Sequence, residues 1–212
     1  MPQLTLPVHP GLRTSTRLGW LLEDRPSESS PGLRDWAVIG LAGVGAAAAS
    51  TFLDFSLRVP GHAILRVILP VMAGLALVPR RGAGTAIGTV ALLTGIGFRA
   101  GGLTGGELGL GALTSLAATG PLLDWTLRRV SGGWRLYLAC GLAGLVSNVL
   151  ALVVRGAAKW YGLEHAGARS LARWLPQAAV TYVLCGLVAG LVCSALWFGT
   201  RRAETPPAAE AE

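Results

Sequence analysis

The sequence predicts an all-α protein, a polytopic membrane helix bundle with about six transmembrane helices. Hydrophobic residues make up 52% of the chain and charged residues only 14%, whereas soluble domains usually carry about 25% charge. Charge is absent from six stretches, which are 36–53, 67–79, 82–98, 108–123, 136–154 and 174–200. A helix of about 20 mostly apolar residues crosses a bilayer, because a helix pairs its own backbone groups.

Six predicted spans follow from these stretches in chain order. Their approximate bounds are 36–53, 61–79, 82–98, 108–123, 136–154 and 175–198. The third and fourth spans are short and rich in glycine, so a re-entrant segment at either place would reduce the number of spans to five. Three regions are expected: a mostly disordered cytoplasmic arm at 1–35, which mixes charges with proline and serine, a transmembrane helical domain at 36–200, and a disordered cytoplasmic tail at 201–212.

Arginine and lysine in the flanks of the spans predict the orientation of the chain. With six spans, the side that holds both termini carries eleven of these residues, and the opposite side carries six. Cytoplasmic flanks are enriched in lysine and arginine. We therefore expect a multi-pass protein of the bacterial plasma (inner) membrane, with both termini in the cytoplasm.

The composition disfavours several classes of function. The formal charge is +7, but the arginines lie between apolar stretches and form no continuous stripe, so membrane lipids rather than a nucleic acid are the expected partners. The three cysteines fall inside predicted spans without a CxxC or Cys/His cluster, so neither a metal nor another cofactor is expected. No HExxH, GxSxG, Walker A or paired-aspartate motif appears, so the chain is not expected to be an enzyme.

Ionisable residues cluster near the external end of the second span. Arg58, His62 and Arg66 are spaced i, i+4, i+8, and His62 and Arg66 are the firmer pair on one helical face. An ionisable residue inside a membrane usually faces a cavity or a charged partner. The alternative is that Arg66 extends to the interface and pairs with Asp54 or Glu107.

Polar residues at the same depth occur on the fifth and sixth spans. Asn148 and Arg155 share a face of the fifth span, and Gln177 and Thr181 share a face of the sixth. Together with the first cluster they predict an outward-facing polar pocket in an apolar bundle, the arrangement that small-molecule binding requires. An interhelical hydrogen bond is the alternative role for Asn148. The expected substrate-binding residues are Asp54, Arg58, His62, Arg66, Glu107, Asn148, Arg155, Gln177 and Thr181.

Small residues recur at four-residue spacing in several spans. Gly84–Gly88 and Gly186–Gly190 are GxxxG matches, which permit close helix contacts. The first span offers a comparable face, and its expected partner-interface residues are Ala42, Gly43, Ala46, Ala47 and Ser50. Packing within the bundle is the alternative role for this face.

The arrangement resembles a known family of membrane proteins. The stretch LALVPRRGAGTAIGTVALLTGIGF at 75–98 combines an apolar helix end, a Pro/Arg/Gly turn and a glycine-spaced helix. With about six spans and a small-residue face on the first, the chain is similar to the substrate-binding S-components of energy-coupling factor (ECF) importers. The resemblance implies capture of a vitamin-like small molecule from outside, docking on a transmembrane coupling subunit, and energy supplied by partner cytoplasmic ATPases. The arginines at 58, 66 and 155, with His62, would then favour a carboxylate or phosphate on the ligand.

Two other functions are compatible with the same residues. A non-catalytic membrane assembly or scaffold protein would use the Gly/Ala faces to hold partner helices, and it predicts no ligand and tolerance of Arg66→Ala. A membrane-embedded lipid-modifying enzyme would use the arginine-rich turns to bind headgroups. The absence of acid pairs and metal ligands from the sequence makes this second alternative the weaker one.

Overall fold

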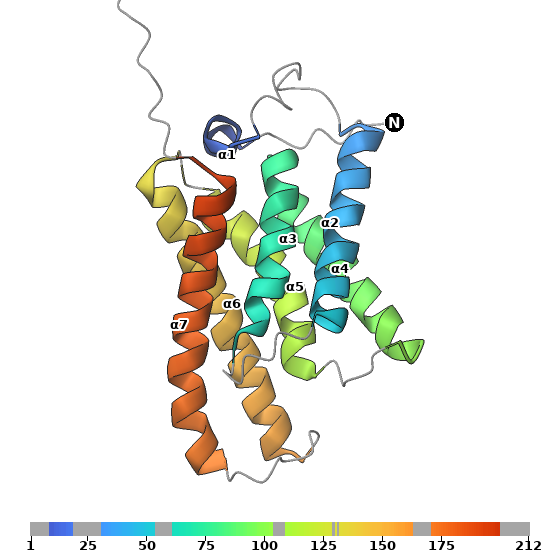
Figure 1. The fold of residues 1–212 in the computed structure, drawn as a ribbon, viewed down its shortest axis with the longest axis vertical. Coiled ribbons are helices and arrows are strands. Elements are labelled where there is room, and N and C mark those ends of the chain that lie inside the picture. Colours follow the sequence, from blue (N-terminus) through green and yellow to red (C-terminus); the bar gives the residue numbers. More distant parts are fainter. Residues whose placement is uncertain are drawn as a thin grey trace, which may run out of the picture.

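A computed structural model of the chain describes residues 9–18, 31–53, 61–103, 109–128, 130, 132–162 and 171–199. One short helix, α1 (Pro10–Ser15), precedes six long helices. These are α2 (Leu33–Phe52), α3 (Ala63–Leu77), α4 (Ala83–Ala100), α5 (Leu110–Leu127), α6 (Trp134–Trp160) and α7 (Leu171–Trp197). The helices pack side by side into one bundle, and α6 and α7 extend beyond the others at the end opposite α1 (Figure 1). The predicted all-α fold class is confirmed.

In the described part of the chain, four helices are long and apolar enough to span a membrane: α2, α4, α6 and the part of α7 from Trp174 to Trp197. The other two long helices are not. α3 has only 15 residues, about 22 Å at 1.5 Å per residue, and α5, whose 18 residues include Pro121 and Asp124, does not reach the hydropathy of the four. The membrane character of the chain is therefore supported, with four helices of spanning length and composition where six were predicted.

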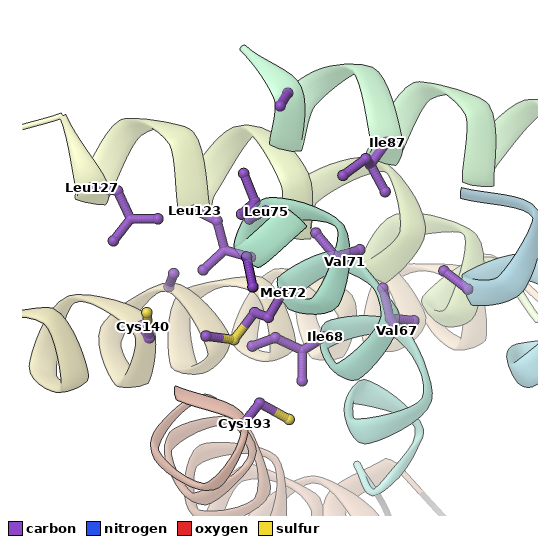
Figure 2. Close-up of a cluster of buried hydrophobic side chains, with 14 of the residues drawn as sticks. Val67, Ile68, Val71, Met72, Leu75, Ile87, Leu123, Leu127, Cys140 and Cys193 are labelled. Carbon is purple, nitrogen blue, oxygen red and sulfur yellow. The ribbon is translucent and has the colours of Figure 1, made fainter. Parts of the chain in front are cut away.

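The shortest of these six helices, α3, lies at the centre of the bundle. It contacts α1, α2, α4, α5, α6 and α7. Its side chains form the hydrophobic core with residues from α4, α5, α6 and α7, as Figure 2 shows. The labelled core residues are Val67, Ile68, Val71, Met72, Leu75, Ile87, Leu123, Leu127, Cys140 and Cys193. Eight of its 15 residues are buried, whereas Leu69 is 41% exposed, so α3 is largely covered by neighbouring helices and keeps one exposed side.

Glycines bring two pairs of helices into close contact. A Cβ atom added at Gly120 of α5 would collide with the backbone of Gly84 in α4. A Cβ atom added at Gly144 of α6 would likewise meet the carbonyl oxygen of Gly186 in α7. The glycine-spaced pairs of the sequence therefore act as helix-packing faces, as small residues commonly do in membrane bundles.

The N-terminal segment departs from the prediction of a disordered arm. Residues 9–18 include α1 and pack on the bundle, where Leu12 is only 2% exposed. The backbone N–H of His9 donates to the carbonyl of Pro79 at 2.8 Å, and the N–H of Gly199 donates to the carbonyl of Ser15 at 2.6 Å. The hydroxyl of Thr16 donates to the carbonyl of Ala76 at 3.2 Å. This segment is thereby held against the ends of α3 and α7; residues 1–8 and 19–30 lie outside the described chain.

Buried polar contacts join the helix ends on the side of the bundle that carries α1. Arg80 forms an ion pair with Asp35 at 3.2 Å, with both side chains about 95% buried (6% and 5% exposed). The carboxylate of Asp124 accepts hydrogen bonds from the backbone N–H of Thr85 at 2.6 Å and from its hydroxyl at 2.7 Å. Asp124 thus satisfies backbone donors at the start of α4. The residue that precedes this helix, Gly82, has a left-handed backbone conformation with φ 88°. These contacts fix one end of the bundle.

Candidate functional site

A polar cavity of about 230 Å³ lies at the other end of the bundle, away from α1. It is enclosed by the last turn of α2, the first turns of α3 and α5, and the facing parts of α6 and α7. The described residues that line it are Ser50, Gly61, Ala63, Arg66, Gly109, Gly111, Ala112, Ser115, Asn148, Ala151, Arg155 and Tyr182.

Asn148 of α6 holds three segments together at the base of the cavity. Its side chain is 1% exposed. Its amide nitrogen donates to the carbonyl of Gly61 at 3.1 Å and to the carbonyl of Tyr182 at 2.7 Å. Both acceptors are carbonyl oxygens, so they determine which side of the amide carries the NH₂ group. Asn148 therefore joins the entry of α3 to α7 and also lines the cavity.

Gly61 adopts a left-handed backbone conformation where the chain turns into α3. Its φ is +90°, a backbone region that residues with a side chain rarely adopt. A Cβ at Gly61 would also come within 3.0 Å of the Cα of Tyr182. A glycine is therefore needed where the chain turns into α3 beside α7.

Arg66 and His62 form the predicted pair at the start of α3. The guanidinium Nη2 of Arg66 lies 3.0 Å from the imidazole Nε2 of His62. Arg66 lines the cavity, whereas His62 lies beside it and is not part of the lining. The i, i+4 spacing correctly predicts that the two side chains meet, but of the two predicted binding residues only Arg66 lines the cavity.

A group of aromatic and cationic side chains on α6 and α7 adjoins the cavity, and two of them, Arg155 and Tyr182, line it. Arg155 Nη1 donates to the hydroxyl of Tyr182 at 3.3 Å. The Arg155 guanidinium lies 5.9 Å from the ring centroid of Trp174, and Lys159 Nζ lies 4.3 Å from the same centroid. Both distances are within the range of cation–π attraction. These contacts hold Arg155 in a defined position at the cavity.

The structure brings together Arg66, Asn148 and Arg155 from the predicted substrate-binding set, but not the pair on the last span. Gln177 is exposed, and the Thr181 hydroxyl donates to the carbonyls of Gln177 and Ala178 in its own helix, each at 3.0 Å. Neither lines the cavity. Asp54, Arg58 and Glu107 lie outside the described residues.

The predicted partner face on the first span is turned inward. Gly43, Ala46 and Ala47 are buried within the chain, and a Cβ added at Gly43 would come within 2.7 Å of Val90 in α4. These residues are not available to a partner, and packing within the bundle is their observed role. Ala42 is partly buried against the core. Ser50 lines the cavity, and its hydroxyl donates to the carbonyl of Ala46 at 2.8 Å.

Sequence reasoning missed Tyr182 and Ser115. Tyr182 is 5% exposed, and it follows Thr181 directly in a helix that is apolar on nearly all sides. One residue corresponds to about 100° of helix rotation, so choosing Thr181 instead of Tyr182 selects the wrong face. An aromatic residue with a hydroxyl in a run of aliphatic residues is the signal that identifies this position, since a buried tyrosine hydroxyl needs a hydrogen-bond partner.

The cavity carries groups suited to binding a small polar molecule. Its described lining has two guanidinium groups, one amide and several hydroxyls, all without a cysteine or histidine. Within the described part of the chain, no group of three or more His, Cys, Asp or Glu residues is placed to hold a metal ion. Comparisons with protein-family models, with curated proteins and with solved structures gave no match for this chain.

Proposed function

We propose that this chain is the substrate-binding component of an ECF-type importer. It captures a vitamin-like small molecule from outside the cell and docks on a coupling membrane subunit. Partner ATPases in the cytoplasm supply the energy, and the chain itself catalyses no reaction. In this proposal the protein lies in the bacterial plasma membrane with both termini in the cytoplasm, so the cavity faces outward.

The observation that carries the proposal is the polar cavity in an otherwise apolar bundle. Arg66 and Arg155 line it together with Asn148 and Tyr182. Small-molecule sites typically combine apolar walls with a few placed polar groups, and ionisable residues inside membrane bundles mark substrate pathways. A scaffold protein does not require such a cavity, which favours binding over assembly.

The docking surface in this proposal is the outward face of α2. Leu41 is 74% exposed and Val44 is 43% exposed. Gly40 and Gly45 lie near them, and a Cβ added at either glycine would meet nothing within 4 Å. Small residues beside exposed aliphatic ones allow a partner helix to approach closely. This face replaces the buried one that the sequence suggested.

Affinity purification of the tagged protein from native membranes in mild detergent tests the proposal. We expect mass spectrometry to detect an ATPase pair and a coupling membrane subunit with the wild-type protein. Gly45→Leu should abolish this recovery by blocking the outward face of α2. Gly97→Leu is the matched control, because Gly97 is an exposed helical glycine on α4 that also has nothing within 4 Å. Well-folded wild-type protein that recovers no ATPase would contradict the importer assignment.

A further inference from the structure

We infer that an anionic phospholipid binds a groove between α2 and α3, with one acyl chain in the groove and its phosphate at Arg34. The inference rests on the membrane character of the chain and does not depend on the importer function. It follows from the lining of the groove, from its depth in the membrane and from the charge at its end.

The groove has a volume of about 250 Å³ and opens on the surface of the bundle. One side of it is the exposed side of α3, where Pro70, Ala73 and Leu77 are partly exposed and three or four residues apart. Helical residues at this spacing share one face. The other side comes from α2, which lies beside α3 (Figure 1). The described residues that line the groove are all apolar: Val38, Leu41, Ala42, Pro70, Ala73, Gly74 and Leu77.

Exposed tryptophans place the groove within one leaflet of the membrane. Trp36, Trp125 and Trp134 are 52%, 68% and 67% exposed, and they lie in the first turn of α2, the last turn of α5 and the first turn of α6. All three helix ends are on the side of the bundle that carries α1. Tryptophan rings prefer the level of the lipid headgroups. Val38 follows the start of α2 by five residues, about 8 Å, so the groove begins below the headgroups, at the depth of the acyl chains.

Arg34 supplies a positive charge at the headgroup end of the groove. It is exposed and precedes Val38 by four residues and Ala42 by eight, so the three share one face of α2. Within the described part of the chain it forms no hydrogen bond or ion pair. The neighbouring acid, Asp35, is buried and paired with Arg80 at 3.2 Å, so its charge is compensated by another arginine. The guanidinium of Arg34 is therefore placed to donate to phosphate oxygens.

An acyl chain matches the size of the groove better than a partner helix does. From Pro70 to Leu77 the groove follows α3 for about 10 Å, whereas a helix with its side chains is about 10–12 Å across. A volume of about 250 Å³ cannot hold such a helix, but a single hydrocarbon chain can lie along it. A headgroup with net negative charge is favoured over a zwitterionic one, whose ammonium group is repelled by the arginine.

Native mass spectrometry of the full-length protein in detergent tests the headgroup. The two probes are phosphatidylglycerol and phosphatidylcholine with the same palmitoyl and oleoyl chains. We expect the first phosphatidylglycerol to bind about fivefold more tightly, the effect of one basic residue near anionic headgroups. Arg34→Gln should abolish this preference. Arg135→Gln is the matched control and should keep it, because Arg135 is also exposed and is also the second residue of a helix that starts at the same end.

A second set of variants tests the groove. Ala73→Leu fills it and should weaken the binding of both lipids by about threefold or more, with their ratio preserved. Ala37→Leu, at an exposed position of α2 outside the groove, should change neither. Leu41→Ala removes part of the α2 side from a position that is 74% exposed and does not support the core, and it should also weaken both lipids. Its control is Leu93→Ala, at a 63% exposed position on α4.

The outcomes separate the headgroup from the groove. Equal affinities of the wild type for the two lipids, or an equal loss of preference in Arg34→Gln and Arg135→Gln, would overturn the phosphate site at Arg34. Unchanged lipid binding in both Ala73→Leu and Leu41→Ala would overturn the groove. None of these measurements involves the polar cavity at the other end of the bundle, so the proposed importer function is tested separately.

Discussion

Asn148 and His9 are buried polar residues at opposite ends of the bundle, and each has a distinct consequence for stability. Asn148 is satisfied by two carbonyls from separate segments. His9 is 3% exposed, and its Nε2 has no hydrogen-bond partner in the described part of the chain. A buried polar group with hydrogen-bond partners stabilises the helices that it joins. A buried polar group without a partner costs free energy.

Asn148→Ala is expected to destabilise the protein by about 2–4 kcal/mol, because two buried carbonyls lose their donor. Thermal unfolding of detergent-solubilised protein measures this as a fall in Tm of roughly 5–10 °C. The control is Gln177→Ala, which removes a side chain of similar chemistry from an exposed position. Matching Tm values for the two variants would show that the Asn148 contacts do not hold α3 to α7.

Docking of the N-terminal segment is expected to weaken as the pH falls. Burial lowers the pKa of His9 below its usual 6.5, Asp124 opposes this, and Arg81 and Arg128 lower it further. The undocked histidine therefore binds a proton at a higher pH than the docked one. The stabilisation from docking neutral His9 is present above pH 6.5 and is lost as the pH falls from there toward the lowered pKa.

The difference in Tm between wild-type protein and His9→Gln measures this effect. We expect the Tm of the wild type, relative to that of His9→Gln, to fall as the pH is lowered from 8 to 5.5, since glutamine does not titrate. A difference that stays constant over this range would mean that His9 does not gain a proton when the segment is released.

At the scale of elements, the charge-free stretches predict the long helices well and their roles poorly. The stretch 36–53 corresponds to α2 and the stretch 82–98 to α4, because an uncharged run of that length is helical in lipid. Hydropathy does not distinguish a helix that faces lipid from one that is largely covered by other helices, so the 15-residue core helix α3 was predicted as a full span.

Helices α1 and α7 show why other parts of the fold and of the candidate site could not be predicted from the sequence. α1 has only six residues and is held by tertiary contacts such as the hydrogen bond from His9 to Pro79, and local sequence patterns do not encode such contacts. The orientation of α7 depends on packing against α6, since its sequence is apolar on nearly every side. The candidate site was therefore predicted on α3 and α6, where polar residues are few and spaced by helical turns, and was misplaced by one residue on α7.

Glycine packing between α4 and α5 is expected to determine stability at the element scale. Gly120→Ala places a Cβ against the backbone of Gly84, and a helix backbone cannot yield as a flexible side chain can. We expect a loss of about 1–3 kcal/mol. Gly45→Ala is the matched control: it also replaces a helical glycine, but nothing lies within 4 Å of its Cβ, so it should be neutral or slightly stabilising. Equal Tm values for the two variants would contradict close packing of α4 on α5.

At the scale of the whole molecule, the two ends of the bundle have different characters. The end with α1 is closed by the Asp35–Arg80 ion pair, the Asp124 contacts and the docked N-terminal segment. The opposite end holds a cavity lined by Arg66 and Arg155. The proposed importer function requires this asymmetry, with one end of the bundle closed and a cavity at the other.

The most direct test of this account is native mass spectrometry of the protein released gently from its own membranes. We predict that the wild-type protein and Gln177→Ala carry the same small molecule, and that Arg155→Gln, with Tm unchanged within about 2 °C, carries none. Recovery of the same bound molecule from Arg155→Gln as from the wild type, at equal occupancy, would contradict the claim that this cavity is the binding site.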